Sequence, residues 1–534
     1  MRYFNIAGPC NKSDHYMIEA STRIQGVEQL IDMKQFFVIH AARQSGKTTY
    51  LKDLTHRLNS EGKYYTLYCS LERMQKVPDP EKGIPEIVKL IKDLLQLSAI
   101  PQKEEFAKNA DYSNFTGVLF TELAWFCKKL DKPFVLLFDE ADCLSEGTLI
   151  AFLRQLRNGY NDRDTIPFVH SLALVGMRNI RDYKAQVRPD SDSHGLASPF
   201  NIVTETFTLE NFTQAEVASL YQQHTDDTGQ QFDDGAIAYI YEQTCGQPWL
   251  VNAVVREIIV KMLRSDYSQT ITAEMAKTAV QTIIIRRDTH IDSLLERLKE
   301  ERVRRVIEPM ISGEDYFDRM SDDYRYVTDL GLIKSIGGRI QPSNPIYGEV
   351  IVRTLSFDMQ EKFMIEKPDY TIPRYLKDGK MDISCLLTDF QQFWRENSAI
   401  WIEKIQYKEA APHLILQGFL QRVLNVPNQD LSMCRFPKGN NGGGHIIRDM
   451  AAGTGRLDLG VVYEHKTYPI EIKLWKGDQY YQRGLEQTAR YADIFGCKEG
   501  WLVVFDQRKR KSWKEKIFRK HERVNDIDIH VFGI

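Results

Sequence analysis

The sequence has little of what would place a protein in a membrane, an oxidising compartment or a metal-stapled fold. No apolar run reaches the length of a transmembrane helix, and Met1–Asn5 leads into no apolar segment of the signal-peptide kind. The eight cysteines lie far apart, without a C-x-x-C pair or a histidine at zinc spacing, which is typical of buried thiols in a reducing compartment. We therefore expect a cytoplasmic protein that does not contact membranes.

Charge of one sign and repetition are also scarce. The formal net charge is only −3 over 534 residues, so no overall field attracts nucleic acid or an anionic membrane, and any such contact must be local. The sequence has no internal repeat and no low-complexity tract. Hydrophobic residues make up 43% of the chain, which is enough for separate cores, and the length predicts three or four domains.

A phosphate-binding pattern organises the first half of the chain. Apolar residues Phe36–Ile39 predict a strand, a polar turn contains Ser45-Gly46-Lys47-Thr48-Thr49, and a helical pattern follows. Backbone N–H groups of such a turn wrap a polyphosphate, Lys47 reaches its β and γ oxygens, and Thr48 holds Mg²⁺. The usual first glycine is Ala41 here, which fits if its φ stays negative. We assign Ser45–Thr49 to an ATP site; the alternative is a chance Gly-Lys-Thr in a loop.

An acidic strand end supplies the partner that such a loop needs. Pro133–Phe138 is a continuous apolar run, as expected of a buried parallel strand, and it ends in Asp139-Glu140. Asp139 would bind Mg²⁺ through water, and Glu140 would orient and activate the attacking water. The alternative is two solvated carboxylates in a loop. Together the two patterns predict an ATPase rather than a passive nucleotide binder.

Three further segments accompany this core. The lead-in Met1–Met33 either packs on the base or is a plain capping helix. Arg178, after the predicted strand Phe168–Val175, is a candidate sensor of the γ-phosphate, although an ordinary surface arginine fits as well. A helical stretch opens with a capping box at Thr213 and carries the turn Thr244–Trp249. Residues 286–355, with a hairpin around Gly337-Gly338, predict a winged helix, for which mixed charge favours an intramolecular role over DNA binding.

The helical stretch is similar to the lid of the signal-transduction and archaeal-type ATPases. In those families the backbone of the corresponding turn lies beside the adenine, so the resemblance assigns Pro248 to the nucleotide site. A helix–turn–helix linker with an ordinary turn is the alternative.

A second constellation follows the linker-like stretch Lys367–Gly379. Predicted strands Gly455–Tyr463 and Tyr468–Trp475 present Asp458, Glu471 and Lys473 on adjacent tips. Two neighbouring carboxylates can hold Mg²⁺ or Mn²⁺, with the Ile472 carbonyl as a further oxygen ligand, while Lys473 orients the activated water or stabilises developing charge. An ordinary charged hairpin is the alternative.

This pattern, D-x(12)-E-x-K, resembles the PD-(D/E)XK nuclease fold. Gln487 and Tyr491 match the Q-x-x-x-Y signature of the branch related to the RecB nuclease. The resemblance implies that a glutamate on the first helix of the domain completes the metal site, and Glu409 fits best, with Glu403 in reserve. Downstream, Gln507–Arg523 is a basic run that suits phosphate contacts, or that places solvated charges on a helix face.

Nearly the whole chain is similar to bacterial AAA-like ATPases fused to a PD-(D/E)XK nuclease. The resemblance implies an α/β protein: a P-loop ATPase parallel-sheet core, a helical lid, a winged helix and a C-terminal restriction-endonuclease-like domain. We place these parts at residues 1–205, 206–285, 286–360 and 381–534, with a linker at 361–380. Ala41 departs from the usual loop and puts nucleotide affinity in doubt.

The implied activity is an ATP- and metal-dependent nuclease acting on nucleic acid, with DNA as the expected substrate, in defence against foreign DNA. Catalytic roles fall to Glu140, Asp458, Glu471 and Lys473. Two other hypotheses stay open: a nucleotide-regulated switch or DNA-binding protein whose nuclease-like domain does not cut, and a translocating motor, disfavoured because no helicase motif set is visible. The sequence leaves the oligomeric state open, including assembly into a homo-oligomer.

Overall fold

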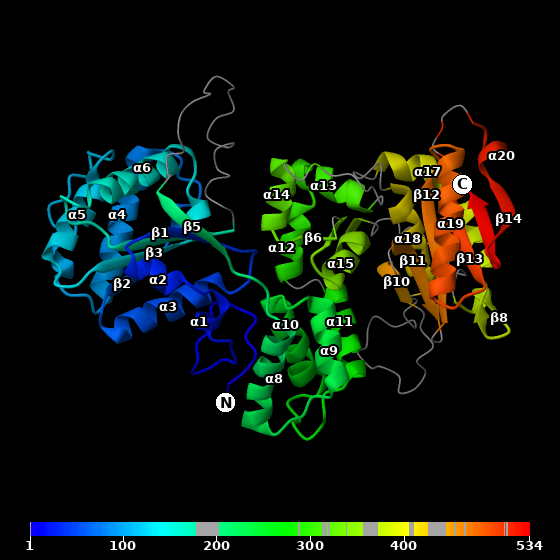
Figure 1. Cartoon of the computed structure of the whole chain (residues 1–534), viewed down its shortest axis with the longest axis horizontal. Coiled ribbons are helices and arrows are strands. Elements are labelled where there is room, and N and C mark those ends of the chain that lie inside the picture. Colours follow the sequence, from blue (N-terminus) through cyan, green and yellow to red (C-terminus); the bar gives the residue numbers. More distant parts are fainter. Residues whose placement is uncertain are drawn as a thin grey trace. The chain divides into compact units, whose positions relative to one another are not determined.

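The chain forms two compact units in a computed structural model (Figure 1). The structure describes residues 2–177, 202–286, 289–311, 318, 321–337, 339–355, 372–404, 411–424, 445–452, 455–463, 466–506, 508 and 511–534. One unit comprises Met1–Leu294 with Asp318–Gly348, and the other comprises Leu295–Phe317 with Glu349–Ile534. Within the described residues, no helix combines the length and apolar character that crossing a bilayer requires.

A parallel five-stranded sheet forms the centre of the first unit. Its strand order is β2-β3-β4-β1-β5, and every neighbouring pair runs parallel. Strands β3 and β4 are buried along their whole length, as expected where helices cover both faces. The strands are β1 Phe36–His40, β2 Tyr65–Ser70, β3 Phe134–Asp139, β4 Ser171–Gly176 and β5 Val203–Thr208. The predicted parallel sheet is confirmed.

Helices pack on the two faces of this sheet and form two separate cores. Because side chains alternate along a strand, Phe36 and Val38 lie in one buried cluster while Phe37 and Ile39 lie in the other. The first cluster includes residues of α4 Pro80–Leu97, α5 Val118–Lys129 and α6 Glu146–Asp162, and the second includes residues of α2 Val27–Asp32 and α3 Lys47–Glu61. The short α1 Ala20–Arg23 lies next to α3.

Capping residues explain where two of these helices begin. The Asp79 carboxylate accepts from the Glu81 N–H at 3.0 Å and Pro80 takes the first position, so α4 starts at Pro80. Thr213 and Glu216 form the predicted capping box at the start of α8 Gln214–Thr228.

The helices that follow form a small bundle. They are α8, α9 Asp234–Thr244, α10 Pro248–Arg256, η5 Glu257–Met262 and α11 Ala273–Arg286. Helix α10 continues directly into the π-helical segment η5, in which the Leu263 N–H bonds to the Ile258 carbonyl at 2.9 Å. Gly246 ends the turn before α10 with φ +70°, and a Cβ there would lie 1.8 Å from the Phe212 oxygen. Only glycine fits this position.

Beyond α11 lie the elements that the winged-helix prediction concerned. The hairpin is confirmed, since β6 Ile333–Ile336 pairs antiparallel with β7 Arg339–Pro342. The helices are α12 Thr289–Arg297, α13 Glu301–Ile311, α14 Asp322–Asp329 and α15 Pro345–Leu355. Helix α13 belongs to the second compact unit, whereas α14 and the hairpin belong to the first.

The second unit contains a separate mixed sheet of six strands in the order β10-β11-β12-β13-β15-β14. Helix α19 Asp478–Ile494 connects β12 to its parallel neighbour β13, and β10 to β12 are antiparallel. The strands are β10 His445–Ala452, β11 Gly455–Tyr463, β12 Lys466–Leu474, β13 Glu499–Phe505, β14 Phe518–Val524 and β15 Ile527–Gly533. The other helices are α17 Ile383–Lys404, α18 Ala411–Leu424 and the four-residue α20 Trp513–Lys516.

Two stretches of this unit differ from simple expectations. The linker-like stretch includes Asp378-Gly379, which forms the turn of a small hairpin between β8 Leu376–Lys377 and β9 Lys380–Met381. Among the described residues of the basic run 507–523, only α20 is helical, whereas Phe518–Val524 is a strand at the edge of the sheet, paired with β15. The helix-face interpretation of its charges is therefore wrong for β14.

Candidate functional site

The polar turn after β1 adopts the geometry of a phosphate-binding loop. Gln44 and Gly46 have φ of +57° and +95°, so the loop bends sharply before α3 starts at Lys47. Ala41 is not among the positive-φ residues of the described chain, which meets the condition set for alanine at this position. The buried Lys47 ammonium donates to the Ala41 and Ala42 carbonyls at 2.9 and 3.0 Å. A cation therefore occupies the centre of the loop.

Thr48 and Asp139 lie together, as the two sequence patterns predicted. The Thr48 hydroxyl donates to Asp139 Oδ2 at 2.6 Å, and the Tyr68 hydroxyl donates to the same oxygen at 3.0 Å. Burial raises the pKa of Tyr68, so this phenol remains a donor. Asp139 is 1% exposed. The Thr48 hydroxyl in the first turn of α3 and the Asp139 carboxylate at the end of β3 are oxygen ligands of the kind that Mg²⁺ prefers.

Glu140 stands at the end of β3 in a strained conformation, with φ +53°. Burial and the neighbouring Asp142 raise the pKa of Glu140 to about 6, whereas Lys47 opposes the shift. A carboxylate with a pKa near neutrality accepts a proton from water more effectively than an ordinary one. Burial also lowers the pKa of Lys47, although the nearby carboxylates, first Glu140, counteract it.

Asp142 and Arg23 complete the surroundings of the loop, and neither was predicted. Asp142 accepts from the Met177 N–H at 3.2 Å and so connects the ends of β3 and β4. The Arg23 guanidinium donates to the Ser45 carbonyl at 2.9 Å and lies 4.8 Å from the ring centre of Phe212. Burial lowers the pKa of Arg23 to about 10. The sequence signal for Asp142 is its place in the D-E-A-D run, whereas Arg23 stands in a segment without a pattern.

The N-terminal segment connects the loop helix with the helical bundle. The Cys10 N–H donates to the Thr49 hydroxyl at 3.0 Å, and the Trp249 indole donates to the Ile6 carbonyl at 2.8 Å. A narrow cavity of about 60 Å³ lies between these parts. Its lining includes Cys10 of the lead-in together with Arg23, Gly46, Thr49, Phe212 and Pro248. The structure thus brings Pro248 and the lead-in beside two residues assigned to the nucleotide site.

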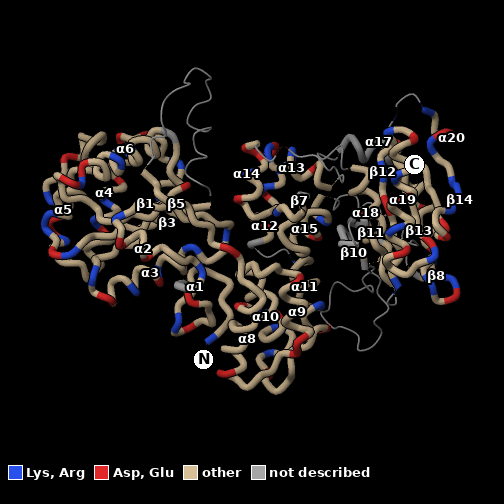
Figure 2. Tube along the Cα trace, in the orientation of Figure 1, with Lys and Arg blue, Asp and Glu red and all other residues tan. Residues whose placement is uncertain are grey.

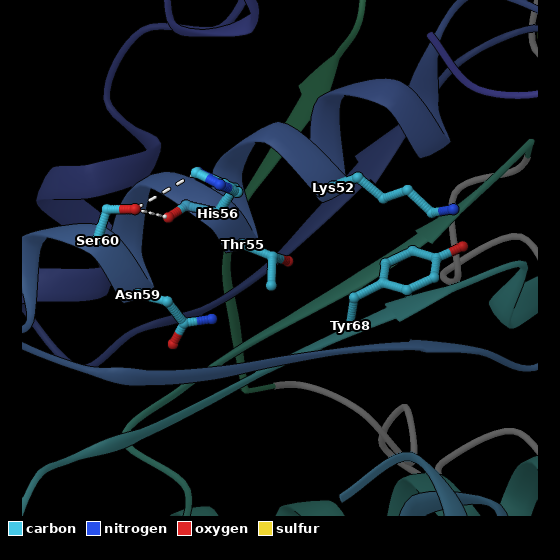
Figure 3. Close-up of a pocket in the computed structure, with 6 residues that line it drawn as sticks. All are labelled: Lys52, Thr55, His56, Asn59, Ser60 and Tyr68. Carbon is cyan, nitrogen blue, oxygen red and sulfur yellow. Dashed lines mark hydrogen bonds between the residues drawn. The ribbon is translucent and has the colours of Figure 1, made fainter. Parts of the chain in front are cut away.

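A larger hollow of about 420 Å³ is lined by residues of α3 and β2 (Figure 3). Figure 3 shows Lys52, Thr55, His56, Asn59 and Ser60 from α3 beside Tyr68 from β2. None of the residues assigned to the nucleotide site lines this hollow. Arg178, the candidate sensor, lies outside the described residues.

The second unit brings Asp458, Glu471 and Lys473 together, as the hairpin prediction required. Lys473 Nζ lies 2.6 Å from Glu471 Oε1 and 3.9 Å from Asp458 Oδ2, while Asp458 Oδ2 accepts from the Ile472 N–H at 2.9 Å. Glu471 is 1% exposed, and its Oε2 is buried without a hydrogen-bond partner among the described groups. Burial and repulsion from Asp458 raise the pKa of Glu471. Although burial alone lowers the pKa of Lys473, the Asp458 and Glu471 charges raise it overall.

Helix α19 packs directly on these strands. A Cβ at Gly484 would lie 3.2 Å from Lys473 Cγ, so the small residue lets the helix approach the lysine stem. Tyr491 is buried, and burial followed by the Glu471 charge raises its pKa. Gln487 has a buried Oε1 without a hydrogen-bond partner among the described groups. The two signature residues therefore lie on the helix that covers this cluster.

The predicted glutamate ligands cannot be placed. Glu409 lies outside the described residues, and the side chain of Glu403 is not described. Across the described part of the chain, no group of three or more His, Cys, Asp or Glu side chains is arranged to hold a metal ion. The buried His413 on α18 was missed: burial lowers its pKa to about 4, and its charge neighbours are Asp458 and Lys473. A signal existed, because His413, Gln417 and Gln421 form a buried polar stripe at helical spacing.

Solved structures that resemble the chain are distant. A Walker-type ATPase of Pyrococcus abyssi is 14% identical, with a TM-score of 0.45, over 65% of this chain and 99% of that one. The RuvB Holliday junction branch migration motor of Thermotoga maritima is 12% identical, with a TM-score of 0.33, over 62% and 92%. The Aeropyrum pernix ORC1 protein in complex with DNA is 12% identical, with a TM-score of 0.33, over 64% and 93%. TM-scores this low define neither a fold nor a function. No curated protein matches the chain.

A family model gives the firm result. The model of an AAA-like domain matches residues 7–352, which is well over half of the chain and includes the loop, Asp139-Glu140 and the helical bundle. Residues 353–534, with the Asp458–Glu471–Lys473 cluster, lie beyond the match. The chain therefore belongs to the AAA-like domain family.

Proposed function

We propose that the first unit binds and hydrolyses ATP at the loop Ser45–Thr49. The observation that carries the proposal is the 2.6 Å contact between Thr48 and Asp139 beside the buried Lys47 ammonium. A loop cation, a hydroxyl and a strand-end carboxylate are the groups that phosphoryl transfer from a nucleotide needs. Membership of the AAA-like family, whose match includes all three residues, supports the same conclusion.

The roles of the residues follow from their present contacts. The Lys47 ammonium, now satisfied by two loop carbonyls, would turn to phosphate oxygens. Thr48 and Asp139 are the residues that would hold Mg²⁺, which neutralises phosphate charge when bound. Glu140 would orient water and accept its proton, for which a pKa of about 6 is suited. Thr49 and Pro248 line the cavity of about 60 Å³, in which the adenine base of ATP would lie. A purine is larger than this cavity, so ATP binding would move the helical bundle and the N-terminal segment apart.

Two substitutions test the ATPase separately. Lys47→Ala should abolish ATP binding in calorimetry, because it removes the ammonium that the Ala41 and Ala42 carbonyls now hold inside the loop. Glu140→Gln should bind ATP normally and lose turnover by about 100-fold or more, as expected for a lost general base. Micromolar ATP affinity in Lys47→Ala, or wild-type turnover in Glu140→Gln, would contradict the assignment.

We further infer that nucleotide binding at the loop changes its contacts with later segments of the same unit, as a switch requires. Three consecutive loop residues, Ala42, Arg43 and Gln44, each contact a different later part of the chain. A Cβ at Gly331 would lie 2.5 Å from Ala42 Cβ, and Arg43 donates to the Ser293 hydroxyl. The Gln247 side-chain amide donates to the Gln44 carbonyl at 3.4 Å. These contacts favour the intramolecular role for the hairpin segment.

The second candidate function is a metal-dependent nuclease in the second unit. The buried Glu471 oxygen without a partner favours it, because an orphaned carboxylate oxygen beside Asp458 is a ready position for a dication. Asp458 and Glu471 would hold Mg²⁺ or Mn²⁺, and the buried His413, whose pKa is lowered to about 4, has Asp458 and Lys473 as its charged neighbours. Lys473 would stabilise developing negative charge on a phosphate or orient water. The order of antiparallel strands, helix α19 and parallel strand supports the resemblance to PD-(D/E)XK nucleases. Nucleic acid as substrate, and DNA in particular, remains part of this proposal.

The nuclease proposal needs its own experiment. The full chain is incubated with Mn²⁺ or Mg²⁺ and linear, circular or single-stranded DNA, with and without ATP. Cleavage should vanish in Asp458→Ala and Lys473→Ala, whereas Mn²⁺ binding should weaken only in the former, because an ammonium supplies no coordinating oxygen. Cleavage that survives both substitutions would identify the cluster as an ordinary charged hairpin. A wild type that cuts nothing would leave the first unit as a switch without a nuclease.

A further inference from the structure

The C-terminal part of the second unit is rich in basic residues, although the chain as a whole carries a small net negative charge. Between Arg508 and Arg523 the sequence has nine basic and two acidic residues, although the whole chain has a net charge of −3. Several of these basic residues lie on α20 and β14, where Figure 2 shows them in blue. Lys516 and Lys520 have no carboxylate within ion-pair distance among the described residues. Their charge is available to an outside anion.

Aromatic rings lie next to these cations. Arg508 lies 5.1 Å from the ring centre of Trp475, whose ring centre lies 6.0 Å from that of Tyr481. Lys520 continues the series at 5.8 Å from the Tyr481 ring and 5.3 Å from the Phe518 ring. These residues, Arg508, Trp475, Tyr481, Lys520 and Phe518, form a cation–aromatic track that runs from the residue after β12 across α19 to β14. Its three rings are half-buried, with one side packed against the core of this unit.

The track begins beside the candidate nuclease cluster. Trp475 follows Lys473 by two residues at the end of β12, where its N–H bonds to the Phe505 carbonyl at 2.8 Å. Asp506 fixes the plane of the Arg508 guanidinium, accepting from it at distances of 2.6 to 3.1 Å, while the Arg508 side chain remains 48% exposed. A fixed, exposed guanidinium plane is a surface on which a nucleobase stacks.

Edge protection, an acidic protein partner and duplex DNA would each use only part of the track. Charged side chains on an edge strand such as β14 discourage pairing with another chain, but this role needs no aromatic rings between them. An acidic protein partner would be met by lysines alone. Duplex DNA presents phosphates on its outside and keeps its bases stacked within. Its phosphates would contact the cations, but its bases could not stack on the rings. Rings interspersed with cations match the bases and phosphates of a single strand.

We propose that this track binds single-stranded DNA and leads it to the Asp458–Glu471–Lys473 cluster. The inference deepens the proposed nuclease function and rests on it for the destination of the strand, but not for binding. We name DNA because stacking and cation contacts, the chemistry shown here, do not need a 2′-hydroxyl.

The test measures binding without cleavage. Fluorescence anisotropy in EDTA, on the full chain, uses labelled single strands of about 20 nucleotides as DNA and RNA, and the DNA duplex of the same sequence. Wild type should bind single-stranded DNA about tenfold more tightly than duplex, with an affinity that falls as salt rises. Trp475→Leu should weaken single-strand binding about tenfold or more. The double variant Arg508→Gln, Lys520→Gln alters only exposed cations and should weaken it several-fold at low salt.

The matched control is Trp125→Leu. Trp125 is an exposed tryptophan, whereas Trp475 is half-buried; like Trp475 it has a cation near its ring, Lys129 at 5.3 Å, but it lies on α5 of the first unit. This variant should bind single strands as wild type does. Unchanged affinity in both track variants, equal or tighter binding of duplex, or tighter binding of RNA than of DNA would overturn the proposal. If the wild type binds DNA as predicted but never cuts it, the track is supported and the nuclease function is refuted. If the protein cuts DNA but the track variants bind it as wild type does, the nuclease function is supported and the track is refuted.

Discussion

Replacing Lys473 with methionine separates the electrostatic work of this residue from its packing. Methionine keeps most of the stem that lies against Gly484 but removes the ammonium 2.6 Å from Glu471 Oε1. The Glu471 carboxylate then lies in the interior next to Asp458 with no cation beside it. We expect the sheet around β12 to be destabilised, and we expect Mn²⁺ to restore part of that loss.

The expected size follows from the geometry. At 2.6 Å and an effective dielectric constant near 20, the Lys473–Glu471 attraction is about 6 kcal/mol. The measured loss should be smaller, about 3 kcal/mol, because a stranded buried carboxylate takes up a proton instead of remaining charged. A dication bound at 100 times its dissociation constant should return about 2.7 kcal/mol.

Native-state hydrogen exchange suits this measurement because it reports the opening of β12 and β13 separately from the rest of a multidomain chain. Protection is compared in wild type, Lys473→Met and Lys466→Met, each with EDTA and with Mn²⁺. Lys466 is an exposed lysine on the same strand, so its replacement should leave protection unchanged. Equal protection of Lys473→Met and wild type, or a Mn²⁺ effect no larger in the variant, would show that Glu471 is not a buried charge awaiting a cation.

Two matched pairs test the first unit. Gly246→Ala should destabilise the helical bundle by several kcal/mol in thermal unfolding, because a Cβ would come within 1.8 Å of a backbone oxygen, whereas Gly229→Ala, with φ +79° but open space around it, should cost about 1 kcal/mol. Tyr68→Phe should cost about 1 to 3 kcal/mol, since it removes a half-buried donor to the buried Asp139, and should leave ATP binding intact in calorimetry. Tyr65→Phe, which loses only an exposed hydroxyl contact on the same strand, should change neither quantity.

The first unit was predictable because its signals are local. The strand–turn–helix pattern at Phe36–Lys47 and the apolar run before Asp139 each specify an element and its chemistry within a few residues. Parallel strands then bring both ends to one edge of the sheet, so Thr48 and Asp139 meet. The same logic placed Asp458, Glu471 and Lys473 together, because antiparallel neighbours bring residues distant in the sequence into register.

Contacts across the fold were not predictable in this way. Arg23 reaches the loop from a segment without periodicity, and the Phe212 backbone requires glycine at position 246 through a contact 34 residues away. Capping residues also decide where helices begin, as Asp79 does for α4. His413 was missed because the family pattern directed attention to glutamates, although its buried polar stripe was visible. Pattern matching finds the groups that chemistry needs and leaves unknown the groups that hold them.

Coupling between the loop and the hairpin segment must act in both directions. If ATP binding shifts Ala42 away from Gly331, then displacing Gly331 must change ATP affinity by the same factor by which ATP changes the exposure of the segment. Gly331→Ala places a Cβ 2.5 Å from Ala42 Cβ at φ +75°, so it should change both ATP affinity in calorimetry and hydrogen-exchange protection of β6, each by about 5-fold or more. Gly337→Ala has φ +57° in the same hairpin but open space around it, and should change neither. A changed affinity with unchanged ATP-dependent protection would break the required symmetry and show that the loop and the hairpin segment respond to nucleotide independently.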